Sequence, residues 1–134
     1  MVYELEMKPF KYSQSHQNDP LGAAVVREVV REIEGNGLIT EAKRKGALFL
    51  RRLESLVDNK IVLDVRGRGL MFAMDFADKN ITNIIYSALI DQGYILGNRG
   101  SSLRIDPPLI VTEAEFEGFF DVIKALIFYH NTTT

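Results

Sequence analysis

Hydrophobic residues between positions 20 and 57 recur every three or four residues, which is the spacing of one face of an α-helix. The first run begins after Asp19-Pro20, where aspartate is a good N-cap and proline suits the first helical position. It ends at Gly35-Asn36-Gly37, since glycine commonly ends helices. The apolar stripe of this first predicted helix contains Leu21, Val25, Val29 and Ile33, with Val26 and Val30 beside it.

A second helix is predicted over roughly 38–57. Its hydrophobic residues alternate steps of three and four, the pattern of a helix face turned toward a core. That predicted stripe consists of Ile39, Ala42, Gly46, Phe49, Leu53 and Leu56.

After position 60 the hydrophobic period changes to two, which predicts strands. Two runs, 61–65 and 70–76, are separated by Arg66-Gly67-Arg68-Gly69. In the second run every residue of one face is apolar, so one side of the predicted sheet is expected to be firmly buried. The residues of that face are Leu70, Phe72, Met74 and Phe76.

The remainder of the chain reads as a helix over 80–92, a short strand over 94–96, a turn over 97–101, a strand over 102–105 and a final helix. The final helix begins at Thr112, where Thr112 and Glu115 form a capping box. Its predicted buried stripe contains Phe116, Phe119, Phe120, Ile123, Leu126 and Ile127.

The element order α, α, β, β, α, β, β, α predicts an α+β two-layer sandwich. In this arrangement helices cover one face of a small, mostly antiparallel sheet. We expect 1–18 to be an extended N-terminal arm, because it has no helical period and Pro9 interrupts it. The folded domain is expected over 19–129, followed by a polar, frayed tail over 130–134.

Composition narrows the classes of function. The chain has 134 residues, 46% of them hydrophobic and 25% charged, which fits one globular domain. A net charge of −2 offers no electrostatic case for nucleic acid or an anionic membrane. There is no signal peptide or membrane segment in the pattern, so we expect a cytoplasmic protein. Zero cysteines exclude disulfides and thiolate metal sites.

Side chains that commonly carry catalysis are poorly placed in this sequence. His16 and His130 fall in the two ends without a partner at metal-ligand spacing, so no metal site is predicted. No Gly-x-Ser-x-Gly turn occurs, and no pair of carboxylates is placed for acid–base work. The glycines of Arg66-Gly67-Arg68-Gly69 lie between two strands, which is the wrong context for a phosphate cradle. They indicate a tight bend or bulge that another backbone approaches closely.

Two charged groups in the sequence have a structural interpretation. Asp64, Arg66, Arg68 and Asp75 are expected to form a polar lattice around the glycine-rich bend. A basic cluster is expected to be the solvated side of the second helix, and it consists of Lys43, Arg44, Lys45, Arg51 and Arg52.

Arg104 is the strongest candidate for a binding residue. It stands inside an apolar strand that ends at Pro107-Pro108. Burying a guanidinium is costly unless a negative group meets it, and its planar fork suits a carboxylate held by two parallel hydrogen bonds. We therefore predict that Arg104 binds an anion. The alternative is a strand-end arginine whose charged head reaches solvent.

Three motifs in order resemble the C-terminal small domain of class III aminotransferases, the pyridoxal-phosphate enzymes that include ornithine, acetylornithine and 4-aminobutyrate aminotransferases. The resemblance covers about residues 13–128. The motifs are Asn18-Asp19-Pro20-Leu21-Gly22-Ala23-Ala24, Asp64-Val65-Arg66-Gly67-Arg68-Gly69-Leu70-Met71 and Leu103-Arg104-Ile105-Asp106-Pro107-Pro108-Leu109.

The resemblance implies roles for two residues. The arginine of the third motif commonly grips the substrate carboxylate, and here that residue is Arg104. Before the first motif the family has a Ser-Thr-Phe-like triplet, whose threonine reaches the cofactor phosphate of the neighbouring subunit of a homodimer. Gln14-Ser15-His16 stands there in this chain, so Ser15 is the candidate phosphate contact, with Ser13 and Gln17 nearby.

The family's cofactor lysine and the aspartate that pairs with the pyridine nitrogen lie in a large domain that precedes residue 1 here. Lys8 and Lys11 match no such motif. The expected function is therefore that of a domain in an enzyme that transfers an amino group from an amine or amino acid to a 2-oxo acid. We expect the 134 residues to be inactive alone.

Two alternatives stay open. In the first alternative, the chain is a stand-alone carboxylate-binding or regulatory module derived from that domain. In the second, it is an assembly module that self-associates through a bare sheet face. Carboxylate binding by a monodisperse purified chain is expected of the first, whereas obligate self-association is expected of the second.

Overall fold

The computed structural model describes residues 19–133. The arm predicted over 1–18 lies outside the described residues. The chain divides into two compact units between Asn36 and Gly37. Each unit is described by itself.

The first unit contains helix α2 (Pro20–Gly35). It begins where the sequence predicts, because Asp19 Oδ1 accepts a hydrogen bond from the backbone N–H of Leu21 at 3.0 Å. At its other end the N–H of Asn36 donates to the carbonyl of Glu32. No residue of α2 is buried. The exposed apolar side chains include Leu21, Val25, Val26, Val29 and Val30.

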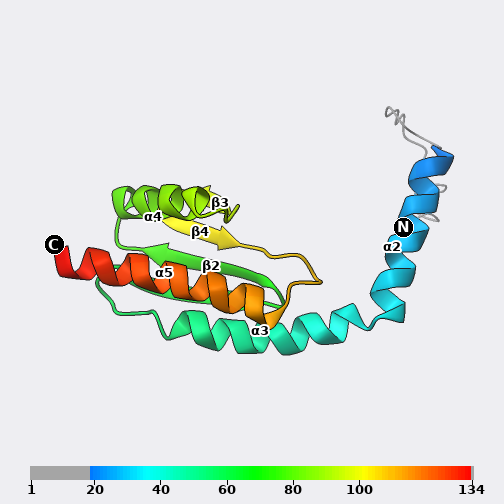
Figure 1. The fold of residues 1–134 in the computed structure, drawn as a ribbon, viewed down its shortest axis with the longest axis horizontal. Coiled ribbons are helices and arrows are strands. Elements are labelled where there is room, and N and C mark those ends of the chain that lie inside the picture. The colour runs from blue at the N-terminus through cyan, green and yellow to red at the C-terminus, as the bar shows by residue number, and fades with distance from the viewer. Residues whose placement is uncertain (1–18, 134) are drawn as a thin grey trace, which may run out of the picture. The chain divides into compact units, whose positions relative to one another are not determined.

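The second unit is an α+β sandwich, as predicted (Figure 1). Its elements in chain order are α3 (Leu38–Glu54), β1 (Val62–Arg68), β2 (Met71–Phe76), α4 (Lys79–Asp91), β3 (Gly97–Arg99), β4 (Ser102–Ile105) and α5 (Glu113–Thr133).

The four strands form one sheet in the order β1-β2-β4-β3, and every neighbouring pair is antiparallel. Both hairpins close on two-residue turns that begin with glycine, Gly69 at φ +59° and Gly100 at φ +76°. Glycine adopts positive φ without steric cost, which explains its presence at both turns.

One face of the sheet is covered by α3, α5 and α4, with α5 between the other two helices (Figure 1). The β2 pattern is confirmed, since Phe72, Met74 and Phe76 are buried and Met71 on the opposite face is exposed. Across the helix layer, the rings of Phe49 and Phe116 stack in parallel with centroids 3.7 Å apart.

Helix α3 approaches the β1–β2 turn at backbone distance. A β-carbon added at Gly46 would collide with the carbonyl of Gly69. The predicted close approach at the glycine-rich segment is therefore confirmed. The bend is only the turn at Gly69 and Leu70, because β1 continues through Gly67 to Arg68. The register irregularity in this hairpin lies earlier, between Val62 and Asp64.

Three basic residues of α3 hold the start of α5, which corrects their prediction as a purely solvated group. Arg44 donates to Glu113 at 2.8 Å, Arg52 donates to Glu117, and Lys45 Nζ donates to the carbonyl of Val111 at 2.7 Å. Hydrogen bonds to Glu41 and Glu113 raise the pKa of Arg44. These contacts fix α5 on α3.

The predicted strand over 94–96 is wrong. These residues leave α4 irregularly, because the N–H of Tyr94 still donates to the carbonyl of Leu89 at 2.9 Å. The strand is instead Gly97–Arg99, in the segment that the sequence assigns to a turn. This strand consists of small and polar residues, so the hydrophobic pattern of the sequence does not reveal its pairing with β4.

Two further differences concern helices. Ile39, predicted to face the core, is 70% exposed because it lies in the first turn of α3, ahead of the buried residues. Helix α5 runs to Thr133 and so includes most of the segment 130–134, which the sequence assigns to a frayed tail. Asn131 holds this end by donating to Asp58 at 2.7 Å.

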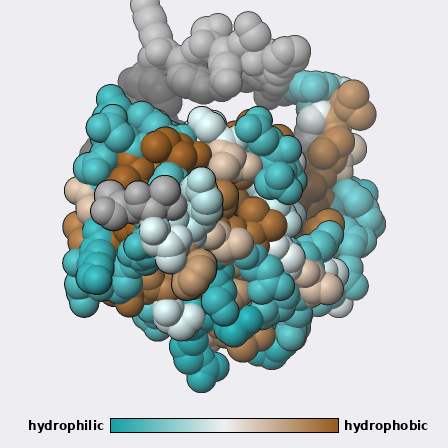
Figure 2. Space-filling model, turned by 60° about the vertical axis from the view of Figure 1, so that its left-hand side comes forward, coloured by the Kyte–Doolittle hydropathy of each residue, from teal (hydrophilic) through white to brown (hydrophobic). Residues whose placement is uncertain are grey.

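Among the described residues, none of the helices is both long and apolar enough to cross a membrane. Large hydrophobic side chains still reach the surface of the second unit, including Ile84, Ile95, Ile110 and Phe128. On the face that Figure 2 shows, hydrophobic surface is broken into patches by hydrophilic residues.

Candidate functional site

The sheet face opposite the helices of the second unit carries a row of four residues in register. Arg66 on β1 pairs with Ala73 on β2, Ala73 pairs with Arg104 on β4, and Arg104 pairs with Gly97 on β3. Side chains alternate along a strand, so the burial of Leu103 and Ile105 places Arg104 on the opposite face. The row therefore places one arginine on each side of an alanine.

Arg104 is half exposed and ion-paired. Its Nη2 donates to Asp106 Oδ2 at 2.9 Å and its Nε to Asp106 Oδ1 at 3.3 Å. The side chains are 49% exposed for Arg104 and 38% for Asp106. The charged head of Arg104 thus reaches solvent, as the alternative expects, and its described partner is a carboxylate of the chain itself.

Gly97 leaves room for the Arg104 side chain. A β-carbon built at Gly97 would lie 3.3 Å from Arg104 Cβ and 3.7 Å from its Nε. On the other side of Arg104, the opposing residue is the small Ala73. Small neighbours on both adjoining strands thus leave the guanidinium above the sheet accessible.

Arg66 is held more completely than Arg104. Its Nη1 donates to Asp64 at 2.8 Å and to Asp75 at 2.5 Å. The hydrogen bond from Arg66 lowers the pKa of Asp75, while partial burial opposes that shift. The predicted lattice therefore forms among Arg66, Asp64 and Asp75. Arg68 makes no ion pair among the described residues.

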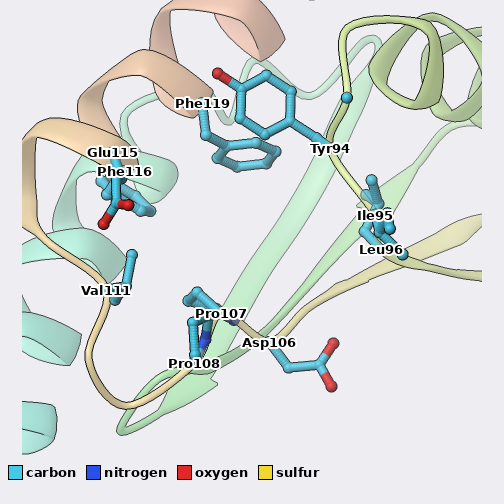
Figure 3. A pocket seen from close by; sticks show the side chains of 11 residues that line it. Tyr94, Ile95, Leu96, Asp106, Pro107, Pro108, Val111, Glu115, Phe116 and Phe119 are labelled. Carbon is cyan, nitrogen blue, oxygen red and sulfur yellow. The ribbon is translucent and has the colours of Figure 1, made fainter.

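A cavity of about 360 Å³ lies beyond the end of β4 (Figure 3). Tyr94 and Phe119 meet edge to face in its wall, with ring centroids 5.3 Å apart. Pro107 and Pro108 line the side nearer to β4. Asp106 also lines the cavity, but its carboxylate points away from the two rings. An apolar hollow thus adjoins the Arg104–Asp106 ion pair.

The cavity is bordered on its helix side by Glu115. The predicted capping box is confirmed, because Thr112 N donates to Glu115 Oε2 at 2.7 Å and Glu115 N donates to Thr112 Oγ1 at 3.2 Å. The hydrogen bonds from Thr112 lower the pKa of Glu115. The same two residues cap the start of α5.

Of the predicted site residues, only Arg104 falls within the described part of the chain. Ser15, with the nearby Ser13 and Gln17, lies outside it, as do His16, Lys8 and Lys11. The described residues contain no group of histidine, aspartate and glutamate side chains able to hold a metal ion.

Sequence reasoning missed Asp106 and Gly97 as partners of Arg104. For Asp106 the signal was present, since residues i and i+2 of an extended chain share a face. For Gly97 it was absent, because the partner of Arg104 across β3 follows only from the strand register.

Comparison with known proteins decides the family. The model of the family described as aminotransferase class-III matches residues 5–127. The chain belongs to the class III aminotransferases. It is 33% identical over 112 residues to an ornithine aminotransferase of Bordetella pertussis, and 30% identical over 122 residues to an acetylornithine aminotransferase of Caldanaerobacter subterraneus.

These alignments cover 82% and 90% of this class III chain but only 27% and 31% of the two relatives. The solved acetylornithine aminotransferase of Elizabethkingia anophelis matches with a TM-score of 0.81 at 25% identity, covering 91% of the chain and 33% of that structure. The chain therefore spans about a third of the length of the relatives it matches.

Class III aminotransferases depend on pyridoxal phosphate, a cofactor whose aldehyde is held by a lysine. The described residues do not fit such a site by themselves. None of their lysines lines the cavity beside Arg104, and Lys45, which contacts the lining residue Val111, donates to the carbonyl of Val111. Within the described residues, the cavity beside Arg104 therefore lacks the lysine that such a cofactor site requires.

Proposed function

We propose that this chain is the small, C-terminal domain of a pyridoxal-phosphate aminotransferase, in which Arg104 binds the carboxylate of the amino acid or 2-oxo acid. The observation that carries the proposal is Arg104 itself. It occupies the family's motif, its side chain is half exposed, and no helix of its own unit covers its face of the sheet. An arginine fork in that position suits a substrate carboxylate.

The work of Arg104 is binding and orientation. A carboxylate held by two parallel hydrogen bonds is fixed in direction as well as in position, which places the rest of the substrate. The cavity lined by Tyr94 and Phe119 adjoins this point and suits an apolar part of the substrate or of a neighbouring domain. Amino transfer itself requires the cofactor, which the proposal assigns to a large domain outside these 134 residues.

The exposed face of α2 favours a partner domain over a stand-alone module. Leu21, Val25 and Val29 follow one another at helical spacing, and all three are more than half exposed. A continuous apolar helix face is normally covered in a working protein. In this proposal the large domain supplies the cover, and the complete enzyme is a homodimer.

Ser15 is proposed as the contact to the cofactor phosphate of the neighbouring subunit. The proposal rests on its position in the triplet that precedes the first motif. A hydroxyl at that position can donate to a phosphate oxygen, whereas the side chain of alanine cannot. Ser15→Ala is expected to weaken cofactor binding in the assembled dimer, measured by the rate at which activity is lost on dialysis.

The test of the proposed function is reconstitution. The Bordetella pertussis relative, deprived of the segment that matches this chain, would be co-expressed with the 134 residues. We expect the two pieces to co-purify and to transfer an amino group from an amino acid to a 2-oxo acid. Neither piece alone is expected to do so. Amino transfer by the 134 residues alone, or an inactive complex that binds pyridoxal phosphate, contradicts the proposal.

A further inference from the structure

Asp106 occupies the edge of the Arg104 guanidinium that recognises carboxylates. Arginine presents Nε and Nη2 along one edge, and two parallel hydrogen bonds from such an edge match the two oxygens of a carboxylate. In this chain Nε faces Oδ1 at 3.3 Å and Nη2 faces Oδ2 at 2.9 Å. A carboxylate of the chain itself thus sits where a substrate carboxylate would bind side-on.

The local sequence builds this arrangement. Asp106 follows the last residue of β4, and in extended chain it shares a face with Arg104 two residues earlier. Pro107 disfavours helical backbone at Asp106 and keeps the segment extended. The ion pair therefore forms within the segment from Arg104 to Pro107, and it requires no contact from another domain.

From this geometry we propose that Asp106 competes with substrate for Arg104 and so sets the affinity of Arg104 for a carboxylate. The inference rests on the proposed function, in which Arg104 binds a carboxylate. An incoming carboxylate has two ways to bind. It displaces Asp106 from the Nε edge, or it takes the other edge of the guanidinium and meets the negative charge of Asp106 close by. Both routes weaken its binding.

The size of the effect follows from the exposure of the pair. An ion pair with half-exposed partners competes only modestly, since exposed pairs contribute little net stability. Removing the charge of Asp106 is therefore expected to tighten carboxylate binding roughly two- to fivefold at low ionic strength. Added salt should shrink the difference, because screening weakens both the pair and the repulsion.

Arg66 shows the contrasting case on the same face. It is bonded to two carboxylates, Asp64 and Asp75, and a hydrogen bond from Arg66 lowers the pKa of Asp75. These two ion pairs occupy the guanidinium of Arg66, so it is less available to an incoming anion. Arg104 has one described partner, which leaves its second edge available and makes Asp106 the residue that sets how strongly it attracts an anion.

The test is a titration of the full 134-residue chain with glutarate at low ionic strength, followed by the NMR signal of the Arg104 Nε–Hε group. That signal is assigned by its loss in Arg104→Lys. The variants are Asp106→Asn, which removes the charge at constant size, and Asp91→Asn as the matched control. Asp91 ends α4 and makes no ion pair among the described residues. Asp106→Ser serves as a second variant if Asp106→Asn does not fold.

The expected result is roughly two- to fivefold tighter glutarate binding in Asp106→Asn than in the unmodified chain, with Asp91→Asn unchanged. Arg104→Lys in the Asp106→Asn background should abolish the gain. Equal affinity with and without the Asp106 charge overturns the role of Asp106 and leaves Arg104 as the carboxylate residue. No glutarate response at Arg104 in any variant also overturns it, whereas the proposed function is judged separately by amino transfer in the reconstituted protein.

Discussion

Gly97 on β3 lies directly opposite Arg104 on β4, and a β-carbon at Gly97 would stand 3.7 Å from the Arg104 Nε. The glycine therefore keeps clear the space that the guanidinium occupies. This pairing connects the short β3–β4 hairpin with the candidate site. It also explains why a three-residue strand without large hydrophobic residues matters to the site.

Gly97→Val should displace the Arg104 side chain. The two methyl groups of valine would enter the space of the Arg104 side chain and disturb its bonds to Asp106. The Arg104 Nε–Hε signal is expected to shift, and NMR of the folded variant measures it. Arg99→Val is the control, since Arg99 faces the same way on the same strand but pairs with Ser102. An Arg104 signal unchanged by Gly97→Val would contradict the proximity argument.

Gly46→Ala should destabilise the second unit, because its new methyl group would collide with the Gly69 carbonyl. Overpacking of this kind costs about 1–3 kcal/mol. Gly118→Ala provides the comparison in another helix, since its methyl group would meet only the Tyr94 hydroxyl at 3.5 Å. There the better helix propensity of alanine should stabilise by up to ~1 kcal/mol. Urea unfolding measures both, and similar effects for the two variants would contradict the close approach of α3.

Lowering the pH should reduce the folding stability of the second unit, because Asp58 becomes protonated. Partial burial raises the pKa of Asp58, but hydrogen bonds from Asn131 and from the backbone of Lys60, Ile61 and Val62 outweigh it and bring the pKa to about 2, from 3.8. The folded-state pKa lies below the unfolded value, so this stability is present above pH 3.8 and is lost as pH falls toward 2.

The loss between these two pH values is on the order of 2 kcal/mol. Urea unfolding across that range measures it, and Asp58→Asn should flatten the pH dependence by that amount. Asp91→Asn, an exposed aspartate without such bonds, should leave the slope as it is. A pH profile unaltered by Asp58→Asn would show that Asp58 does not contribute.

Local chemistry made some of the fold predictable. Asp19-Pro20 and the capping box of Thr112 and Glu115 mark helix starts in the sequence, and both helices begin there. The alternation through Phe72, Met74 and Phe76 specified the buried face of β2, because a period of two has no other simple explanation.

Other features depend on contacts between distant segments. The strand at Gly97–Arg99 has no hydrophobic alternation, and only its pairing with β4 defines it. The constraint on Gly46 appears only when α3 lies against the β1–β2 turn. Arg104 could be proposed as a binding residue from its motif, whereas its half-exposed side chain and the room that Gly97 provides follow only from the structure.

The most direct test of the central claim is the steady-state kinetics of Arg104→Lys in the reconstituted aminotransferase. Lysine keeps the charge but loses the planar fork, so the account predicts a fall in kcat/KM of about 10- to 100-fold, mostly through a higher KM for the carboxylate-bearing substrate. Unchanged kinetic constants in an enzyme that is otherwise active would contradict the assignment of Arg104 as the substrate-carboxylate residue.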